Sequence, residues 1–363
     1  MATVSIKCPA CGGPLAWDAS KKKFFCEYCR SAYTEEELAK INPETAEAKA
    51  VSLEEAQATH KVNAEGKDKT AKIKVYNCPS CGANIAADET MAASVCYYCH
   101  NPIVLSDRLD GDFQPDKVIP FAVDKKKASQ IFESWIKQHK YLPREFYSKD
   151  EVDKLQGVYF PYWVYNCKID SKASGFGYVD KVWTDSQFQY TDTTKYAIDR
   201  EGTMPINNVS RIALKKASKA LCESVVPFNF EDAIPFNSAY LQGYVAEMRD
   251  VDKDSIEPEV TQEVRNYAAN QMRLEAGREY NKTEFTSVTA DIKDPNWQYI
   301  LMPVWTITYK DRDSSKVYYF SINGSTGKTV GELPVDKGKL WGLFAKIAVP
   351  VFVFLVAIMH FLG

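Results

Sequence analysis

The clearest pattern in the chain is an apolar run at its C-terminal end. Residues 340–362 read LWGLFAKIAVPVFVFLVAIMHFL, interrupted only by Lys346 and His360. A helix of this length covers about 34 Å, and the hydrocarbon core of a bilayer is about 30 Å thick. The alternative is a buried core helix, but the stretch from Ile347 to Ile358 has no polar face. The run therefore predicts a transmembrane helix over 340–362.

Upstream, the pattern changes to a mixture of helical and strand periodicities across residues 107–335. Helical spacing predicts helices over 125–140, from 213 to about 221, and over 258–280, the last with these residues on or near one face: Val260, Val264, Tyr267, Ala268, Met272 and Leu274. Aromatic and β-branched runs predict strands over 118–123, 157–169, 174–183, 188–200, 203–209, 283–292, 299–310, 316–323 and 329–333. We expect a large, mostly antiparallel α+β domain.

Two pairs of similar tripeptides inside this domain suggest a duplication. Ile234-Pro235-Phe236 repeats Ile119-Pro120-Phe121, and Pro303-Val304-Trp305 resembles Pro161-Tyr162-Trp163. We interpret the domain as two related halves, 107–211 and 212–335, within one continuous sheet. Accidental similarity is the alternative.

Residues 34–74 carry a different pattern, rich in Glu, Lys and Ala and without a strand signal. Thr34 with Glu37 and Ser52 with Glu55 match the capping box that begins many helices. The segment is therefore expected to form two helices broken near Asn42-Pro43. A solvated linker is the alternative.

Eight of the ten cysteines form two quartets with the same internal spacing, displaced by 70 residues: Cys8, Cys11, Cys26 and Cys29, then Cys78, Cys81, Cys96 and Cys99. Two residues between paired cysteines let both thiolates reach one ion, and two such knuckles complete a closed tetrahedral site. Gly12 and Gly82 follow the first knuckles and suit their tight backbone, whereas Arg30 and His100 stand in that position in the second knuckles.

The quartets predict two zinc ribbons, 1–33 and 75–106, each holding one structural zinc ion. Four thiolates leave no open coordination position for catalysis, and a module this small needs the metal to fold. Redox dithiols and an iron–sulfur cluster are the competing interpretations.

Net charge of -3 argues against a general polyanion binder. The first ribbon alone carries a lysine run, Lys21 to Lys23, followed by Phe24-Phe25, so it could contact phosphates and stack a base. A solvated hairpin tip is the simpler explanation of the three lysines.

The usual catalytic signatures do not emerge. Gly327-Lys328-Thr329 resembles the end of a phosphate-binding loop, but Ile322 stands where the required glycine would be, so we interpret it as a hairpin turn. Cys167 and Cys222 lack a neighbouring histidine and are expected to be buried thiols. The sequence leaves open whether folding brings two carboxylates together as a catalytic pair. We expect no enzyme and assign no catalytic residue.

Lys337, Lys339 and Lys346 precede or begin the apolar run, and Gly363 alone follows it. The excess of positive charge on that side predicts a single-pass, tail-anchored protein of the cell membrane whose bulk is cytoplasmic. In a reducing compartment the cysteines serve as metal ligands rather than disulfides.

The whole chain resembles the bacterial TFIIB-type zinc-ribbon-containing membrane proteins. The resemblance rests on the two ribbons, the C-terminal span and the motifs IPF, GVYFPYW (157–163), LMPVW (301–305) and INGSTGKTVGELP (322–334). It implies an adaptor that meets protein partners, such as flotillin-like or phage-shock-type membrane proteins. A membrane-held nucleic-acid-binding regulator using the first ribbon is the alternative.

Overall fold

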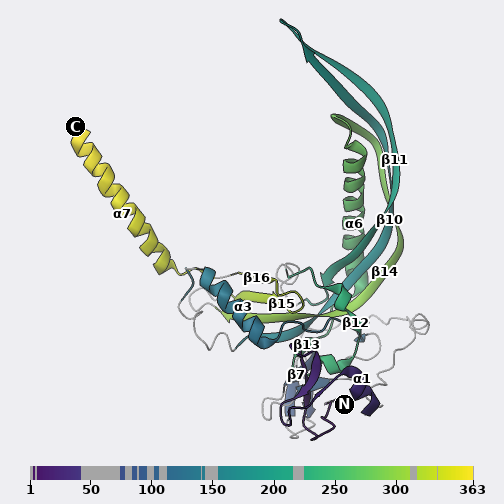
Figure 1. Ribbon diagram of the computed structural model, residues 1–363, viewed down its shortest axis with the longest axis vertical. Coiled ribbons are helices and arrows are strands. Elements are labelled where there is room, and N and C mark those ends of the chain that lie inside the picture. Colours follow the sequence, from purple (N-terminus) through teal and green to yellow (C-terminus); the bar gives the residue numbers. More distant parts are fainter. Residues whose placement is uncertain are drawn as a thin grey trace. The chain divides into compact units, whose positions relative to one another are not determined.

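Figure 1 shows the computed structural model of the chain. The described residues are 3–4, 6–41, 74–77, 84–87, 90–95, 102–105, 113–139, 141–143, 154–215, 225–310, 317–332 and 334–362. They belong to two compact units that alternate along the sequence. The first comprises 1–160, 216–248 and 301–363, and the second comprises 161–215 and 249–300.

The N-terminal module belongs to the first unit. A three-stranded sheet contains β2 (Leu15–Asp18), β3 (Lys23–Cys26) and β4 (Ala32–Tyr33), and helix α1 (Glu35–Ile41) follows it. Thr34 and Glu37 form the expected capping box, since each backbone N–H donates to the other side chain, at 2.8 and 3.3 Å. The predicted helix beginning near Ser52 lies outside the described residues. Farther along, β5 (Lys74–Asn77) and β6 (Asn84–Ala87) form a separate hairpin.

An eleven-stranded sheet contains most of the other strands, in the order β1-β8-β7-β13-β10-β14-β15-β16, with β11 beside β10 and β9 paired with both β12 and β14. Its strands are β1 (Thr3–Val4), β7 (Met91–Val95), β8 (Pro102–Leu105), β9 (Lys117–Val118), β10 (Gln156–Thr184), β11 (Gln189–Ile212), β12 (Ile234–Pro235), β13 (Val245–Glu247), β14 (Lys282–Lys310), β15 (Val317–Asn323) and β16 (Thr329–Gly331). The helices are α3 (Lys125–Gln138), α6 (Lys253–Gly277), α7 (Lys337–Leu362) and the 3₁₀ turns η4 (Phe230–Asp232) and η5 (Ser238–Leu241). Of the described pairs, β10 with β13 is parallel and the rest are antiparallel, which confirms a mixed, sheet-rich α+β fold.

The core of the first unit is built around Phe121, just after β9. Its ring stacks on Tyr244 with centroids 4.2 Å apart, and it meets Tyr159 and Trp305 edge-on at 5.0 and 5.1 Å. All four rings are buried. Such aromatic pairs contribute about 0.5–1.5 kcal/mol each beyond the burial of their area. The cluster thus joins segments that are far apart in sequence.

Two glycines allow the neighbouring backbones to approach these rings. A Cβ atom on Gly157 would lie 2.6 Å from Tyr244 Cδ1, and one on Gly324 would lie 2.7 Å from Phe121 Cδ1. The Gly324 carbonyl also accepts hydrogen bonds from the N–H groups of Ala122 and Val123. The glycines of the GVYFPYW and INGST motifs are therefore packing requirements of this cluster.

The turn after β15 matches the predicted hairpin. β15 and β16 are antiparallel, and Gly327 has a φ of +78°, which suits glycine. Buried Asn323 fixes the loop: its Oδ1 accepts from the N–H groups of Ser325 and Thr326, and its Nδ2 donates to the carbonyls of Val225 and Pro227. Gly327-Lys328-Thr329 is a turn rather than a phosphate loop.

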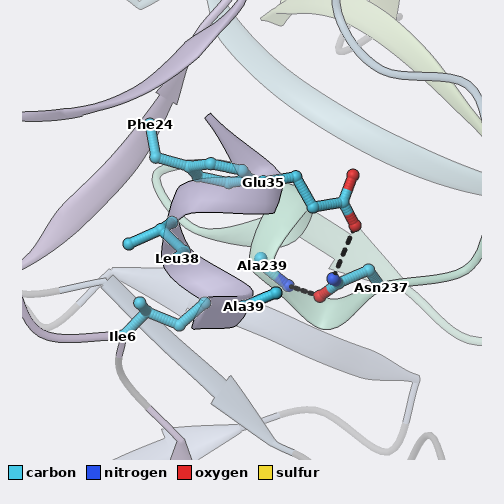
Figure 2. A pocket seen from close by; sticks show the side chains of 7 residues that line it. All are labelled: Ile6, Phe24, Glu35, Leu38, Ala39, Asn237 and Ala239. Atoms are coloured by element: carbon cyan, nitrogen blue, oxygen red, sulfur yellow. Dashed lines mark hydrogen bonds between the residues drawn. The ribbon is translucent and has the colours of Figure 1, made fainter. Parts of the chain in front are cut away.

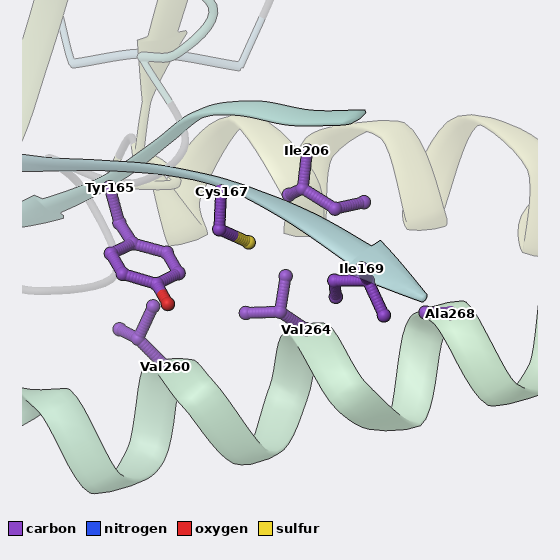
Figure 3. Packing of buried hydrophobic residues seen from close by; sticks show 7 residues of the cluster. All are labelled: Tyr165, Cys167, Ile169, Ile206, Val260, Val264 and Ala268. Carbon is purple, nitrogen blue, oxygen red and sulfur yellow. The ribbon is translucent and has the colours of Figure 1, made fainter. Parts of the chain in front are cut away.

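In the second unit, β10 and β11 form one long hairpin, and helix α6 covers part of it. Figure 3 shows the contact, where side chains from β10 and β11 meet one face of the helix. The buried cluster consists of Tyr165, Cys167, Ile169, Ile206, Val260, Val264 and Ala268. Cys167 is the expected buried thiol, and its burial raises its pKa.

Several gaps between predicted strands are instead continuous strand. β11 runs through Glu201 and Gly202, between the predicted strands 188–200 and 203–209, because these residues pair with β10: Glu201 lies opposite Lys172, and their side chains form an ion pair at 2.7 Å. β14 likewise continues through Asp294, whose φ of +50° accommodates a local irregularity. Pairing over a long ladder has overridden the local turn preference.

The predicted bounds near β9 and α6 also need correction. β9 ends at Val118 rather than at 123, because Pro120 has no N–H to continue the ladder. Helix α6 begins at Lys253 instead of Pro258, which lies inside it. Residues 213–215, where a helix was predicted to begin, are not helical, and the rest of that prediction lies outside the described residues.

Two residues predicted on the buried face of α6, Tyr267 and Leu274, are exposed. The buried stripe follows Val260, Val264 and Ala268, at a spacing of four. Four residues turn a helix by about 400°, so this stripe winds around the axis. Tyr267 and Leu274, which follow Val260 at a spacing of seven residues, therefore leave the buried face.

The C-terminal run forms the single helix α7. Its segment 338–356 is long and apolar enough to cross a membrane, and none of it is buried inside the structure. The helix begins three residues before the predicted span, at Lys337. Its exposed apolar surface is what a membrane-spanning helix presents.

The close approach of β10 and β14 yields a test. A Cβ atom on Gly175 would lie 2.3 Å from the backbone oxygen of Glu284, whereas one on Gly202 would have only Met272 Cε nearby, at 3.8 Å. Gly175→Ala should lower the free energy of unfolding by about 1–3 kcal/mol, because backbone atoms cannot move aside cheaply. The matched control Gly202→Ala should be neutral or slightly stabilising. Denaturant unfolding of the detergent-solubilised protein measures both, and equal effects would contradict the proposed clash.

Candidate metal centre and its attachment

The first knuckle is a tight backbone turn closed by two hydrogen bonds. The Cys8 N–H donates to the Gly13 carbonyl at 2.6 Å, and the Gly12 N–H donates to the Cys8 carbonyl at 2.8 Å. Gly12 has a φ of +73°, a conformation that residues with a Cβ atom rarely adopt. The glycine predicted to follow this knuckle therefore has its expected role.

The second knuckle repeats this geometry without a glycine. The Cys26 N–H donates to the Ser31 carbonyl at 2.9 Å, and the Arg30 N–H donates to the Cys26 carbonyl at 2.8 Å. Arg30 adopts a φ of +63°, close to that of Gly12. Arg30 therefore gives the turn the same shape as a glycine would, at the cost of local backbone strain.

The two knuckles bring the four predicted ligands together. The Sγ atoms of Cys8, Cys11, Cys26 and Cys29 all lie within 4.8 Å of one another. Two of the distances, Cys8 to Cys29 and Cys11 to Cys26, are 3.5 Å. A tetrahedral zinc site with zinc–sulfur bonds of about 2.3 Å has sulfur–sulfur edges of about 3.8 Å. The cluster therefore fits one tetrahedral metal ion.

Charge explains why this cluster suits a cation. Hydrogen bonds from Ser31 lower the pKa of Cys29 to about 6. A hydrogen bond from the Gly13 N–H lowers the pKa of Cys11. The hydrogen bonds of the Cys11 thiol to Cys29 and Cys26 outweigh this and raise its pKa to about 12. The Cys29 thiolate therefore forms readily, and its negative charge then opposes the ionisation of a second cysteine in the cluster. A bound divalent cation would stabilise all four thiolates, and four such ligands leave no open position for a substrate.

Among the described residues, one further cysteine lies outside this cluster. Cys167 lies in the core of the second unit. The second quartet, Cys78, Cys81, Cys96 and Cys99, lies outside the described residues, as does Cys222. The second metal site stays a prediction.

The metal-binding module is attached to the rest of the first unit by side chains. Glu35 accepts a hydrogen bond from Asn237 Nδ2 at 2.9 Å, which Figure 2 marks with a dashed line. The second carboxylate oxygen of Glu35 accepts from the Tyr240 hydroxyl at 2.7 Å. Burial, followed by this bond to Glu35, raises the pKa of Tyr240, so its hydroxyl stays a donor. Helix α1 is thus fixed to η5.

A second attachment point is Trp17 on β2. Its Nε1 donates to the Phe121 carbonyl at 3.1 Å, and the Tyr244 hydroxyl donates to the Trp17 carbonyl at 3.3 Å. The Trp17 ring also packs against Phe24 and Tyr240, at centroid distances of 5.2 and 4.8 Å. The module therefore rests on the aromatic cluster of the first unit.

Sequence reasoning missed this attachment. Glu35 and Tyr240 are separated by 205 residues, and neither belongs to a recognisable motif. The pocket beside them, shown in Figure 2, is lined by Ile6, Phe24, Glu35, Leu38, Ala39, Asn237 and Ala239 and has a volume of about 170 Å³. Ligand pockets usually exceed about 300 Å³. We interpret it as a packing gap.

The structure also locates the residues suggested for base stacking. Phe24 is 1% exposed, so its ring is not available to a nucleobase. Lys21 lies 3.1 Å from Asp18 and 3.5 Å from the centre of the Phe25 ring. The lysine run therefore lies beside a carboxylate and a partly covered ring.

Comparison with known proteins gives one relationship over nearly the full length. Over 345 residues, 95% of this chain and 94% of the relative, the chain is 27% identical to the uncharacterized protein YdjG of Bacillus subtilis (strain 168). No family model matches the chain. No solved structure matches it either. The relative shares the length of the chain and carries no stated activity.

The metal assignment can be tested by removing one ligand. Cys26→Ser should lower the zinc content by about one ion per chain, because three thiolates and a hydroxyl hold zinc far less tightly. Cys167→Ala, which removes a buried thiol outside the cluster, should leave the content unchanged. Elemental analysis of the purified full-length protein measures both. Iron in place of zinc, or equal metal in both variants, would overturn the assignment.

Proposed function

We propose that this protein is a membrane-tethered adaptor that holds partner proteins at the cytoplasmic face of the cell membrane. Helix α7 supplies the tether, and the lysines around its start, Lys337, Lys339 and Lys346, favour a cytoplasmic location for the bulk of the chain. Two structural zinc ions, one in each cysteine quartet, stiffen the ribbons. The observation that carries the proposal is an exposed aromatic surface at the end of the β10–β11 hairpin.

Beyond Asp180 this hairpin has no described neighbour. The last contacts with the start of β14 are the Asn281 N–H to the Tyr178 carbonyl, at 2.8 Å, and the Asp180 N–H to Asn281 Oδ1, at 2.7 Å. Figure 1 shows β10 and β11 continuing past the ends of α6 and β14. Residues 181–192 are therefore a free two-stranded tip.

Three aromatic rings gather on one side of this tip. Trp183 stacks on its cross-strand partner Tyr190 with centroids 5.7 Å apart, and Phe188 meets Tyr190 edge-on at 6.5 Å. The three side chains are 48%, 42% and 62% exposed. Exposed aromatic clusters of this kind are typical of protein interfaces, where Trp and Tyr contribute a large share of the binding energy.

Asp185 holds the tip in a defined shape. Its Oδ1 accepts from the N–H groups of Gln187 and Phe188, each at 2.8 Å, and its Oδ2 accepts from the Tyr190 hydroxyl at 3.0 Å. The backbone bonds lower the pKa of Asp185, so it remains ionised at neutral pH. A surface fixed in advance loses little conformational entropy on binding.

The partners expected from the family resemblance are flotillin-like or phage-shock-type membrane proteins. Such partners also lie at the membrane, where a tether raises their effective concentration. The tip and the ribbons would then supply separate docking surfaces, as an adaptor requires.

A nucleic-acid-binding regulator is the weaker alternative. Three consecutive lysines, Lys21 to Lys23, favour it. The burial of Phe24 and the pairing of Lys21 with Asp18 count against a phosphate-and-stacking site.

The adaptor proposal is tested at the tip. Trp183→Ala should reduce cross-linking to a partner in native membranes at least about tenfold, because a central aromatic residue carries much of an interface. The matched control is Val182→Ala, an exposed residue whose side chain points to the opposite face of the same strand. Quantitative mass spectrometry of cross-linked complexes measures both. Equal cross-linking of the partner by both variants and the wild type would show that the tip is not the docking surface.

The nucleic-acid-binding alternative is tested by a different measurement. We expect no DNA or RNA binding tighter than about micromolar at physiological salt, since Phe24 is buried and Lys21 pairs with Asp18. Fluorescence anisotropy of labelled oligonucleotides over a range of salt concentrations tests this. Submicromolar binding with a steep salt dependence, flattened by replacing Lys21, Lys22 and Lys23 with Gln, would favour the regulator.

A further inference from the structure

The first turn of α7 is bonded directly to the loop that follows α3. The Asp336 N–H donates to the Tyr141 carbonyl at 2.8 Å, and Lys339 Nζ donates to the Leu142 carbonyl at 2.6 Å. Asp336 also caps the helix, because its Oδ1 accepts from the Lys339 N–H at 3.1 Å. Residues 141 and 142 therefore lie at the level where the apolar helix begins.

Charge at this junction is mainly positive. On α3, the exposed lysines Lys125, Lys126 and Lys127 lie in the first turn, about 15 Å along the helix axis from the junction, and the helix carries one acidic residue, Glu133. Lys137 is in the last turn, nearest to the loop. Helix α7 contains no Asp or Glu, and the carboxylate of Asp336 is engaged in capping. The end of α3 and the start of α7 thus form a cationic border.

Aromatic residues lie on the same border. Tyr141 and Trp341 are exposed, and Trp341 meets Phe344 edge-on at a centroid distance of 5.5 Å. Trp and Tyr concentrate at the interface between headgroups and acyl chains, because their rings have both polar and apolar parts. The opposite face of α3 is not available to a ligand, since Phe132 and Trp135 pack on Phe320.

We propose that this border, formed by Lys137, Tyr141, Lys339 and Trp341, is a binding site for anionic lipid headgroups. The inference rests on the proposed membrane tether. If 340–362 spans the bilayer, the hydrogen-bonded loop lies among the headgroups, so lipid is the phase that covers it. The lysines favour an anionic phosphate over a zwitterionic headgroup, because basic side chains close to the surface attract negatively charged lipids.

The experiment uses the full-length protein in vesicles of phosphatidylcholine and phosphatidylglycerol. Brominated versions of either lipid quench tryptophans at the bilayer surface, and the ratio of quenching gives the relative affinity for the two headgroups. We expect a preference of about fivefold for phosphatidylglycerol, which falls toward one in the Lys137→Gln, Lys339→Gln double variant. Lys137→Arg keeps the charge and should keep the preference. Lys172→Gln, which removes an exposed lysine of the second unit, should also keep it.

Three results would overturn the lipid site, and a fourth would overturn the tether instead. No preference in the wild type, or an unchanged preference in the double variant, removes the lipid site while the tether stands. Cross-linking from position 137 to a polypeptide rather than to lipid would assign the border to a protein partner and also remove the site. Release of the full-length protein by alkaline carbonate, with no quenching by either lipid, would show that α7 does not span the membrane.

Discussion

Packing around the Phe121 ring is the constraint on which the first unit depends. The ring contacts Tyr159 from β10, Tyr244 from the segment before β13 and Trp305 from β14, and Gly324 lies against it. A protein interior is close-packed, so a contact made by several distant segments fixes all of them at once. The short strands β9 and β12 pair over only two residues, and such a ladder is too short to hold them alone. The aromatic cluster, rather than strand pairing, specifies this part of the fold.

The metal-binding module depends on the same cluster. Trp17 donates to the carbonyl of Phe121 itself, and Tyr244, which stacks on Phe121, donates to Trp17. A module of about 30 residues cannot bury enough apolar surface to be stable alone, so we expect its shape to depend on a metal ion bound by its four clustered cysteines. An ion bound there would therefore have a structural effect beyond the knuckles, because it would maintain β2, whose Trp17 packs on the core. A closed four-cysteine cluster suits this role, since it needs no substrate position.

The sequence predicted what depends on local spacing and missed what depends on distant contacts. Cysteine spacing identified Cys8, Cys11, Cys26 and Cys29, and the capping box located α1, because these patterns encode geometry over a few residues. The attachment through Glu35, Asn237 and Tyr240 left no pattern, since its members lie about 200 residues apart. The predicted strand lengths were wrong for a related reason: Glu201 and Gly202 fell in a gap between two predicted strands, but their pairing with β10 across the hairpin decides their conformation. The motifs GVYFPYW and LMPVW carry the family resemblance, yet only the structure shows that Tyr159 and Trp305 both meet Phe121.

The aromatic residues of this chain serve two purposes, and their burial separates them. Phe121, Tyr159 and Trp305 are buried and specify the core. Trp183, Phe188 and Tyr190 contribute to no described core cluster, and the tip that carries them is paired only within itself. Exposed rings on a soluble surface favour aggregation, so a chain gains nothing in stability by holding them in one arrangement with Asp185. Such an arrangement is explained by binding, because a fixed aromatic surface binds a partner with a smaller loss of entropy. The same composition that builds the core therefore also supports an interaction surface in the second unit.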